Sequence, residues 1–146
     1  MKKMFTLRGV SNTGKTTKIK QIAQWVIDNY SVTKPHQIDT KQGEILGILE
    51  VNKLRLGFVS AGDDLVHVKK VEQLLNNKDG DAVDIIINAC RTRGAGRRYL
   101  ENNFNKRNGW LIVNIYIKQL DALDIAEQSS RDVEVLDELK SWLTGL

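Results

Sequence analysis

The sequence predicts an α/β fold, a three-layer sandwich in which helices cover both faces of a mostly parallel central sheet. Short apolar runs of strand length alternate with segments whose apolar residues recur at helical spacing. The most hydrophobic segment, residues 83–90, is typical of a central parallel strand that is buried on both faces. Residues 43–60 instead have the pattern of an antiparallel hairpin. We expect one domain, residues 1–146, because a chain of this length can bury a normal core.

The chain begins with a predicted strand, a loop and a helix. Residues 4–7 form a short apolar run that suits a buried strand. A later set of apolar residues has the spacing of an amphipathic helix: Ile19, Ile22, Ala23, Val26, Ile27 and Tyr30. Residues 31–35 are expected to form a connector.

Local pattern also predicts the hairpin turn and the helix that follows the hairpin. The polar pair Asn52-Lys53 would form a two-residue turn, because apolar residues alternate with other residues on the strand after it. Residues 65–75 carry apolar side chains at helical spacing and predict a second amphipathic helix, which ends by Gly80.

The rest of the chain continues the alternation of strands and helices. Residues 91–98 predict a basic, glycine-containing turn, and residues 99–105 predict a short helix. The apolar residues 110–117 predict a further strand. The tail predicts a helix that Ser129 or Ser130 would cap at its N-terminus.

Composition limits the classes of protein to consider. Hydrophobic residues make up 41% of the chain, and no apolar run approaches membrane-spanning length, so no membrane partner is expected. The basic start, Lys2 and Lys3, lacks the apolar stretch of a signal peptide. The one cysteine, Cys90, fits a cytoplasmic setting and a buried structural thiol. A net charge of +4 is compatible with phosphate ligands.

Residues 9–16 read Gly-Val-Ser-Asn-Thr-Gly-Lys-Thr, which matches the pattern G-x-x-x-x-G-K-T. A glycine-rich turn between a strand and a helix aims several backbone N–H groups at one point. The helix start adds partial positive charge there, so that a polyphosphate is held. The segment resembles the phosphate-binding loop of the P-loop NTPase superfamily. The resemblance is at the level of the superfamily, and its motif covers only the first part of the chain.

The resemblance implies that the chain binds Mg²⁺ and ATP or another nucleoside triphosphate. Lys15 would reach the β- and γ-phosphates, and the hydroxyl of Thr16 would ligate Mg²⁺. The residues expected to bind the nucleotide are Gly9, Ser11, Asn12, Thr13, Gly14, Lys15, Thr16 and Thr17. The sequence does not specify whether the base is adenine or guanine.

Three polar segments follow predicted strands: the loop from Gly9, residues 60–64 and residues 88–98. Ligands of such sheets lie at the carboxyl ends of the strands. We therefore expect the three segments to meet at one edge of the sheet.

Asp63 and Asp64 follow a predicted strand and a glycine. We assign to Asp63 the role of holding Mg²⁺ through water or activating an acceptor hydroxyl. The competing interpretation is helix capping, which fits Asp64 better. The hairpin followed by this segment looks like the second switch of small GTPases. A GTPase is disfavoured, because Val59 stands where that family has aspartate and no guanine-reading motif is found.

Four arginines crowd one short segment: Arg91, Arg93, Arg97 and Arg98. Cations at the start of a helix oppose the helix dipole, so an anionic ligand would explain them. Small-molecule and nucleotide kinases resemble this, since an arginine-bearing lid closes over the phosphoryl group that they transfer. Arg93 and Arg97 are the expected lid residues, with Gly94 and Gly96 as hinges. The alternatives are a solvated basic loop and a contact with nucleic acid.

These features lead to three hypotheses about function. The first is an enzyme, a small kinase-like phosphotransferase that moves the γ-phosphoryl of ATP to an unidentified small acceptor, for example a nucleotide. Its catalytic residues would be Lys15, Asp63, Arg93 and Arg97. The second is an NTP hydrolase or nucleotide-dependent switch that acts on a protein or nucleic-acid partner. The third is a nucleic-acid-binding module without turnover.

Overall fold

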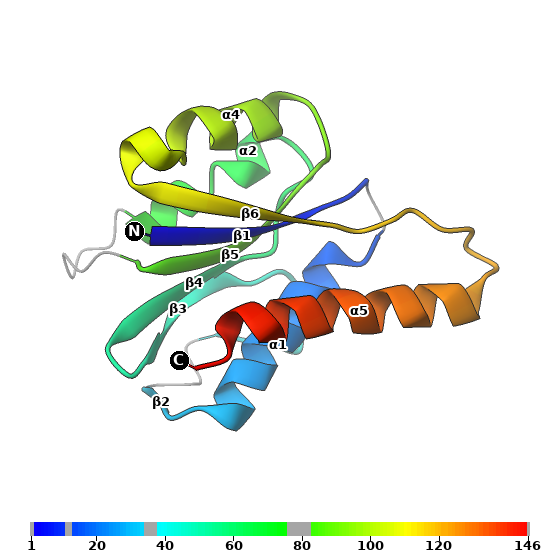
Figure 1. The fold of residues 1–146 in the computed structure, drawn as a ribbon, viewed down its shortest axis with the longest axis horizontal. Helices are drawn as coiled ribbons and strands as arrows, with labels where there is room; N and C mark the ends of the chain where they lie inside the picture. The colour runs from blue at the N-terminus through cyan, green and yellow to red at the C-terminus, as the bar shows by residue number, and fades with distance from the viewer. Residues whose placement is uncertain (1, 11–12, 34–37, 76–82, 146) are drawn as a thin grey trace.

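A computed structural model describes residues 2–10, 13–33, 38–75 and 83–145 of the chain. In these residues, one sheet of six strands is covered by helices on both faces (Figure 1). The strands are β1 (Lys2–Arg8), β2 (Val32–Thr33), β3 (Leu46–Val51), β4 (Leu54–Val59), β5 (Ile85–Cys90) and β6 (Trp110–Tyr116). The helices are α1 (Lys15–Asn29), α2 (Leu65–Val68), α3 (Val71–Leu75), α4 (Ala95–Asn103), the 3-10 turn η2 (Lys106–Asn108) and α5 (Ile125–Leu143).

The sheet is mixed, with strand order β2-β3-β4-β5-β1-β6. Strands β4, β5, β1 and β6 are parallel to their neighbours, whereas β3 pairs antiparallel with both β4 and β2. The prediction of an α/β fold is confirmed, but the prediction of a mostly parallel sheet is wrong. The hairpin supplies one antiparallel pair, and the supposed connector after α1 contains β2, which supplies the other. Two residues are too few for any periodicity to mark a strand.

The predicted hairpin is confirmed, and its turn has the expected backbone. Asn52 and Lys53 have positive φ values of 50° and 70°. Two-residue hairpin turns need positive φ at both central residues, so that the turn follows the right-handed twist of the strands. The hairpin ends at the same sheet edge as β1 and β5, because β4 runs parallel to β5.

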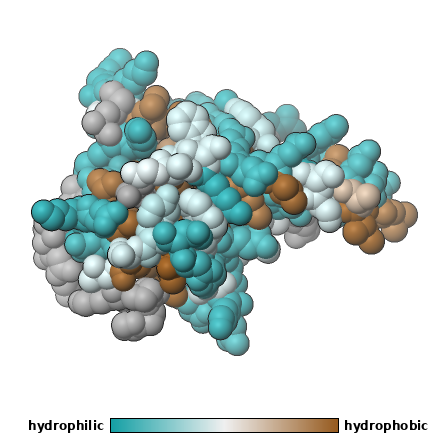
Figure 2. Space-filling view, turned by 60° about the horizontal axis from the view of Figure 1, so that its bottom comes forward, coloured by the Kyte–Doolittle hydropathy of each residue, from teal (hydrophilic) through white to brown (hydrophobic). Residues whose placement is uncertain are grey.

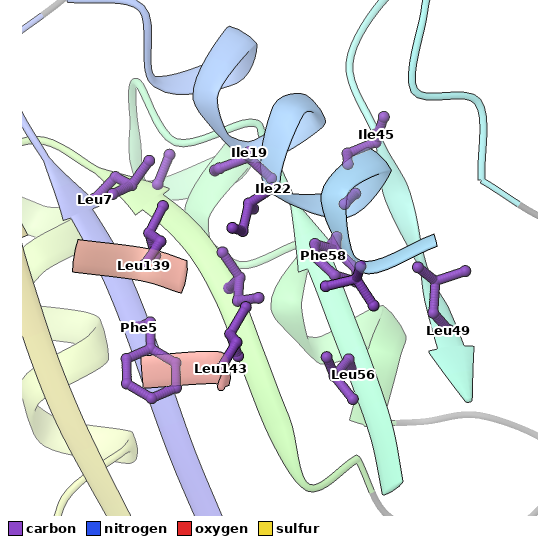
Figure 3. Close-up of a cluster of buried hydrophobic side chains, with 14 of the residues drawn as sticks. Phe5, Leu7, Ile19, Ile22, Ile45, Leu49, Leu56, Phe58, Leu139 and Leu143 are labelled. Atoms are coloured by element: carbon purple, nitrogen blue, oxygen red, sulfur yellow. The ribbon is translucent and has the colours of Figure 1, made fainter. Parts of the chain in front are cut away.

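Successive side chains of β1 point to opposite faces of the sheet and pack into two separate cores. Phe5 and Leu7 face α1 and α5, whereas Met4 lies in the core beneath α2 and α4. Figure 3 shows the first core, where side chains from β1, α1, α5 and the hairpin point toward one another. Burying one large apolar side chain contributes roughly 1.5–3 kcal/mol, so these cores hold the helices to the sheet.

Three predicted helices differ from the observed ones. The predicted helix over residues 65–75 is two short helices, α2 and α3. Between them, the amides of Lys70 and Glu72 donate to carbonyls three residues earlier, and not four as in an α-helix. Helix α4 begins at Ala95, four residues before the predicted start.

Helix α5 begins at Ile125 and is not capped by a serine. The side chain of Asp124 accepts a hydrogen bond from the amide of Glu127 at 3.1 Å, so Asp124 is the N-cap. The predicted caps Ser129 and Ser130 therefore lie inside the helix.

The connection between β6 and α5 extends beyond the sheet (Figure 1). Figure 2 shows apolar surface at this end of the molecule, where Leu123 is 90% exposed and Ile125 is 73% exposed. None of the helices in the described ranges has the length and apolar composition needed to cross a lipid bilayer.

Candidate functional site

The glycine-rich segment connects the end of β1 to the start of α1, as predicted. Gly14 is the N-cap of α1 and has a φ of 78°, in the left-handed region that favours glycine. A Cβ built on Gly14 would lie 2.8 Å from Nζ of Lys18. A Cβ on Gly9 would lie 2.6 Å from Oγ1 of Thr13. The positive φ of Gly14 therefore favours glycine at this position, and a side chain at Gly9 would displace the hydroxyl of Thr13. Ser11 and Asn12 lie outside the described residues.

Lys15 lies folded over this loop. Its side chain is 6% exposed, and Nζ donates hydrogen bonds to the carbonyls of Gly9 at 3.0 Å and Val10 at 2.7 Å. The same ammonium lies 3.9 Å from Oδ1 of Asp63. Burial lowers the pKa of Lys15, and the nearby Asp63 carboxylate opposes this shift. The loop thus fixes a cation at the N-terminus of α1.

A pocket of about 200 Å³ opens beside Lys15, and we call it the phosphate pocket. It brings together three predicted site residues, Lys15, Thr16 and Asp63. Its lining residues are Gly14, Lys15, Thr16, Thr17, Glu44, Ser60, Gly62 and Asp63. The Thr16 hydroxyl donates to the carbonyl of Ser60 at 3.4 Å, which links α1 to the end of the hairpin. Sequence reasoning missed Glu44, because it stands alone before an apolar strand.

The oxygen atoms of this pocket fit a magnesium ion. Mg²⁺ prefers oxygen ligands, keeps several waters and uses one or two carboxylates together with substrate phosphates. The Thr16 hydroxyl and the Asp63 carboxylate are such ligands and line the same pocket. No group of three or more His, Cys, Asp or Glu side chains in the described ranges could hold a metal ion by itself, so a metal ion here would take its other ligands from water and phosphate.

Asp63 and Asp64 have different surroundings. Asp64 is the N-cap of α2, and its carboxylate accepts hydrogen bonds from the amide of His67 at 2.9 Å and from Nδ1 of His67 at 2.7 Å. The bond from the His67 amide lowers the pKa of Asp64. Asp63 faces Lys15 instead. The capping interpretation is therefore confirmed for Asp64 and not for Asp63.

A second pocket of about 260 Å³ adjoins the first, and we call it the arginine cleft. The two share Gly62 and Asp63. The cleft is lined by residues 62–65, by Cys90 and Arg91, and by residues 93–97. A Cβ on Gly62 would lie 2.1 Å from the carbonyl oxygen of Ala89, so only glycine allows the loop after β4 to press on the end of β5.

Of the cleft arginines, Arg91 and Arg93 precede α4, and Arg97 belongs to it. Arg97 lies in the first turn of α4, where its Nε donates to Glu101 at 2.7 Å and its Nη1 donates to the carbonyl of Thr92. Gly94 has a φ of 108°, but Gly96 is buried inside the helix. A Cβ on Gly96 would lie 2.9 Å from Val68, so Gly96 is a packing contact and the prediction that it forms a hinge is wrong.

Lys18 supports the loop from below and was missed in the sequence. Its side chain is 3% exposed, and Nζ donates to the carbonyls of Thr13 at 3.2 Å and Gly14 at 3.4 Å. Nζ also forms an ion pair of 2.7 Å with Asp132 of α5. Burial alone would raise the pKa of Asp132, but the hydrogen bonds from Lys18 and Arg131 outweigh it and the pKa is lowered.

Arg8, the last residue of β1, was also missed. It is fully buried, its Nε donates to Oδ1 of Asn114 at 2.6 Å, and its Nη1 donates to the carbonyl of Arg91 at 3.3 Å. Its Nη2 has no hydrogen-bond partner in the described part of the chain. A charged residue at a buried strand position next to the glycine-rich loop is the sequence signal that could have identified it.

Cys90 is buried, as predicted, and burial raises the pKa of its thiol. It lines the arginine cleft without the depressed pKa that a nucleophilic cysteine needs.

Comparisons with known proteins gave no match. No family model, no curated protein and no solved structure is significantly similar to this chain.

Proposed function

We propose that this chain is a P-loop protein that binds Mg²⁺ and ATP, and that it is a small kinase-like phosphotransferase. The observation that carries the proposal is the phosphate pocket, in which Lys15, Thr16 and Asp63 meet at the N-terminus of α1. Backbone N–H groups and the dipole of a 15-residue helix favour phosphate at this position.

The residues of the phosphate pocket have separate roles in the proposed reaction. The ammonium of Lys15 neutralises charge on the β- and γ-phosphates. Thr16 would ligate Mg²⁺ and Asp63 would hold it through water, and the ion would supply charge stabilisation for the transferred phosphoryl group. Lys18 holds the carbonyls of Thr13 and Gly14, so that the N–H groups of the loop stay aimed at the phosphates.

The arginine cleft is the proposed place of the acceptor. Asp63 lies at the junction of the two pockets, where a carboxylate can accept a proton from an acceptor hydroxyl. Arg93 and Arg97 line the cleft and would stabilise negative charge that develops during transfer.

A nucleotide-dependent switch is the second candidate function. The contact between Thr16 and the carbonyl of Ser60 favours it, since it joins the nucleotide loop to the segment that leads into α2. Such a switch hydrolyses ATP slowly, and its affinity for a partner differs between the ATP and ADP states.

Transfer from γ-labelled ATP tests the first function. The protein is incubated with Mg²⁺ and pooled nucleoside monophosphates, nucleosides and sugar phosphates. We expect label on an acceptor, and a loss of about 100-fold or more in Lys15→Ala, because a donor aimed at the reacting phosphates is removed. Lys20→Ala, on the same helix but outside the lining of both pockets, is the matched control. Label that appears only as free phosphate would favour the switch, and full turnover in Lys15→Ala would refute both functions.

The neighbouring aspartates allow a second test with a matched pair. Asp63→Asn should lower turnover strongly and cost little stability, because the Asp63 carboxylate is 61% exposed, lies 3.9 Å from the Lys15 ammonium and caps no helix. Asp64→Asn should change turnover much less than Asp63→Asn, because the Asp64 side chain caps α2 and asparagine also caps helices. Equal turnover in the two variants would remove Asp63 from the mechanism.

A further inference from the structure

We propose that the arginine cleft binds a phosphate monoester group of the acceptor, so that the substrate is a small molecule with both a phosphate and a hydroxyl. The phosphate is an anchor on the arginines, and the hydroxyl reaches Asp63 at the junction with the phosphate pocket. The identity of this ligand as the acceptor rests on the proposed function, whereas the anion site itself rests on the features below.

The first feature is a buried cation without a carboxylate partner. Arg8 has no exposed surface, and its two hydrogen-bonded nitrogens meet neutral oxygens, of Asn114 and of the Arg91 backbone. Its third nitrogen, Nη2, has no partner among the described residues. A buried charge without a counter-charge is strongly unfavourable, so an anion that binds nearby relieves a cost already present in the fold.

The second feature is the position of this guanidinium against the floor of the cleft. In the sheet, Arg8 lies beside Cys90 in register, and its charge opposes the rise in the pKa of the Cys90 thiol that burial causes. Nη1 donates to the carbonyl of the next residue, Arg91. Cys90 and Arg91 line the cleft and Arg8 does not, so the buried charge lies behind these two lining residues.

The third feature is the opposite wall, which is also positive. Arg93 and Arg97 line the cleft together with the first residues of α4, and Arg97 is also ion-paired with Glu101 at 2.7 Å, so Arg93 carries most of this charge. Helix α4 has nine residues, no acidic residue in its first turn and a glycine N-cap without a side-chain hydrogen bond, so its dipole is not compensated locally. Arg91 also lies close enough to Lys15 to lower the pKa of that ammonium. Guanidinium groups and helix N–H groups together form a phosphate site.

The two carboxylates that line the cleft, Asp63 and Asp64, both belong to the loop between β4 and α2. Asp64 is engaged with the amide and ring of His67. Asp63 lies at the shared edge with the phosphate pocket, where a proton acceptor is useful. At about 260 Å³, the cleft is smaller than the roughly 300–1,000 Å³ of sites for drug-sized ligands, so it fits the phosphorylated end of a small acceptor.

This arrangement defines the chemistry of transfer. The acceptor hydroxyl oxygen bonds to the γ-phosphorus of ATP, and the bond from that phosphorus to the β–γ bridging oxygen breaks. ADP leaves with the electron pair of that bond, and the hydroxyl proton goes to the Asp63 carboxylate. The product carries two phosphate groups on separate oxygens, and the anchoring phosphate is unchanged.

Binding of ribose 5-phosphate, compared with ribose, tests the anion site without turnover. Calorimetric titrations use the wild-type chain and Lys15→Ala, in which the phosphate pocket lacks its lysine. We expect ribose 5-phosphate to bind both proteins, ribose to bind neither, and affinity to fall as salt rises. Equal affinity for ribose and ribose 5-phosphate, or binding that disappears in Lys15→Ala, would overturn the proposal.

Variants of the cleft locate the site. Arg91→Ala and Arg93→Ala should each weaken ribose 5-phosphate binding at least tenfold. Arg98→Ala, an exposed neighbour on α4 that does not line the cleft, should leave binding unchanged. Arg8→Met should also lose binding of ribose 5-phosphate, with its folding checked by circular dichroism. If this variant does not fold, Arg91→Ala and Arg93→Ala test the site. Equal effects of Arg93→Ala and Arg98→Ala would overturn the site.

A second titration separates this inference from the proposed function. A non-hydrolysable ATP analogue with Mg²⁺ should bind wild type and Arg93→Ala alike, and it should fail to bind Lys15→Ala. If the wild-type chain binds ribose 5-phosphate but not the ATP analogue, the proposed function is refuted and the anion site in the arginine cleft is retained. If the wild-type chain binds the ATP analogue but not ribose 5-phosphate, the anion site in the arginine cleft is refuted and the proposed function is retained.

Discussion

The two faces of the sheet each bury a basic side chain, but they compensate its charge differently. On the face covered by α1 and α5, Lys18 forms an ion pair of 2.7 Å with Asp132. On the face covered by α2 and α4, Arg8 is bound only by neutral oxygens in the described part of the chain. Lys18 can therefore serve as a fixed support for the loop, whereas the charge of Arg8 remains to act on a ligand.

The surroundings of the two side chains show the same contrast. At α1, the buried polar side chains Thr13, Lys15 and Lys18 belong to the glycine-rich loop and the first turn of the helix. The other face instead buries Thr6 and Asn88 beside Arg8, within the sheet. Thr6 Oγ1 donates to Oδ1 of Asn88 at 2.7 Å, so this polar group is ordered. We infer that the α1–α5 face holds the larger apolar core behind the phosphate loop, whereas the α2–α4 face supplies the buried positive charge beside the arginine cleft. The predictions below test this division.

The largest effect on stability should come from the apolar face. Leu139 of α5 is fully buried in the core shown in Figure 3, so Leu139→Ala removes apolar contacts and leaves a cavity. We expect the free energy of unfolding to fall by about 3 kcal/mol in a urea titration. Leu123→Ala, at a position that is 90% exposed, should change it by less than about 0.5 kcal/mol. Similar losses in the two variants would contradict the placement of this core.

The next effect concerns the paired lysine. Asp132→Ala leaves the ammonium of Lys18 buried without its carboxylate, and we expect a loss of about 2 kcal/mol. This is less than for a fully buried pair, because the Asp132 side chain is 40% exposed and partly screened by solvent. The same variant should weaken ATP-analogue binding, since Lys18 holds the carbonyls of Thr13 and Gly14.

A matched control for this variant is Asp137→Ala, an exposed position on the same helix. It should change neither stability nor binding. If Asp132→Ala lowers stability but leaves analogue binding intact, Lys18 stabilises the fold without positioning the loop.

Arg8 should behave differently from Lys18 when its charge is removed. Arg8→Met loses hydrogen bonds to two neutral oxygens but also removes a buried charge that has no carboxylate partner among the described residues. These effects offset, so the free energy of unfolding should stay within about 1 kcal/mol of wild type. A loss as large as that of a broken buried ion pair would show that Arg8 is compensated in the folded protein, and the contrast between the two faces would fail.

Sequence patterns predicted the parts of this molecule that are local. The strands β1, β5 and β6, the hairpin turn and α1 follow from periodicity or from a contiguous motif, because their determinants lie within a few residues of each other. The two-residue strand β2 and the break between α2 and α3 are too short to leave such a pattern. The buried cations depend on partners far along the chain: Arg8 and Asn114 are 106 residues apart. No local pattern reports such a partner.

The smallest effect is the pH dependence of the Lys18–Asp132 pair. The folded pKa of Asp132 is lowered below its unfolded value, which is about 3.9. The pair therefore contributes fully above that unfolded pKa, and the contribution is lost as pH falls through the folded pKa. The difference in unfolding free energy between wild type and Asp132→Ala should be constant from pH 7 to about pH 4 and shrink below it. A difference that already shrinks between about pH 7 and pH 5 would mean that titration of another group, and not of Asp132, controls the pair.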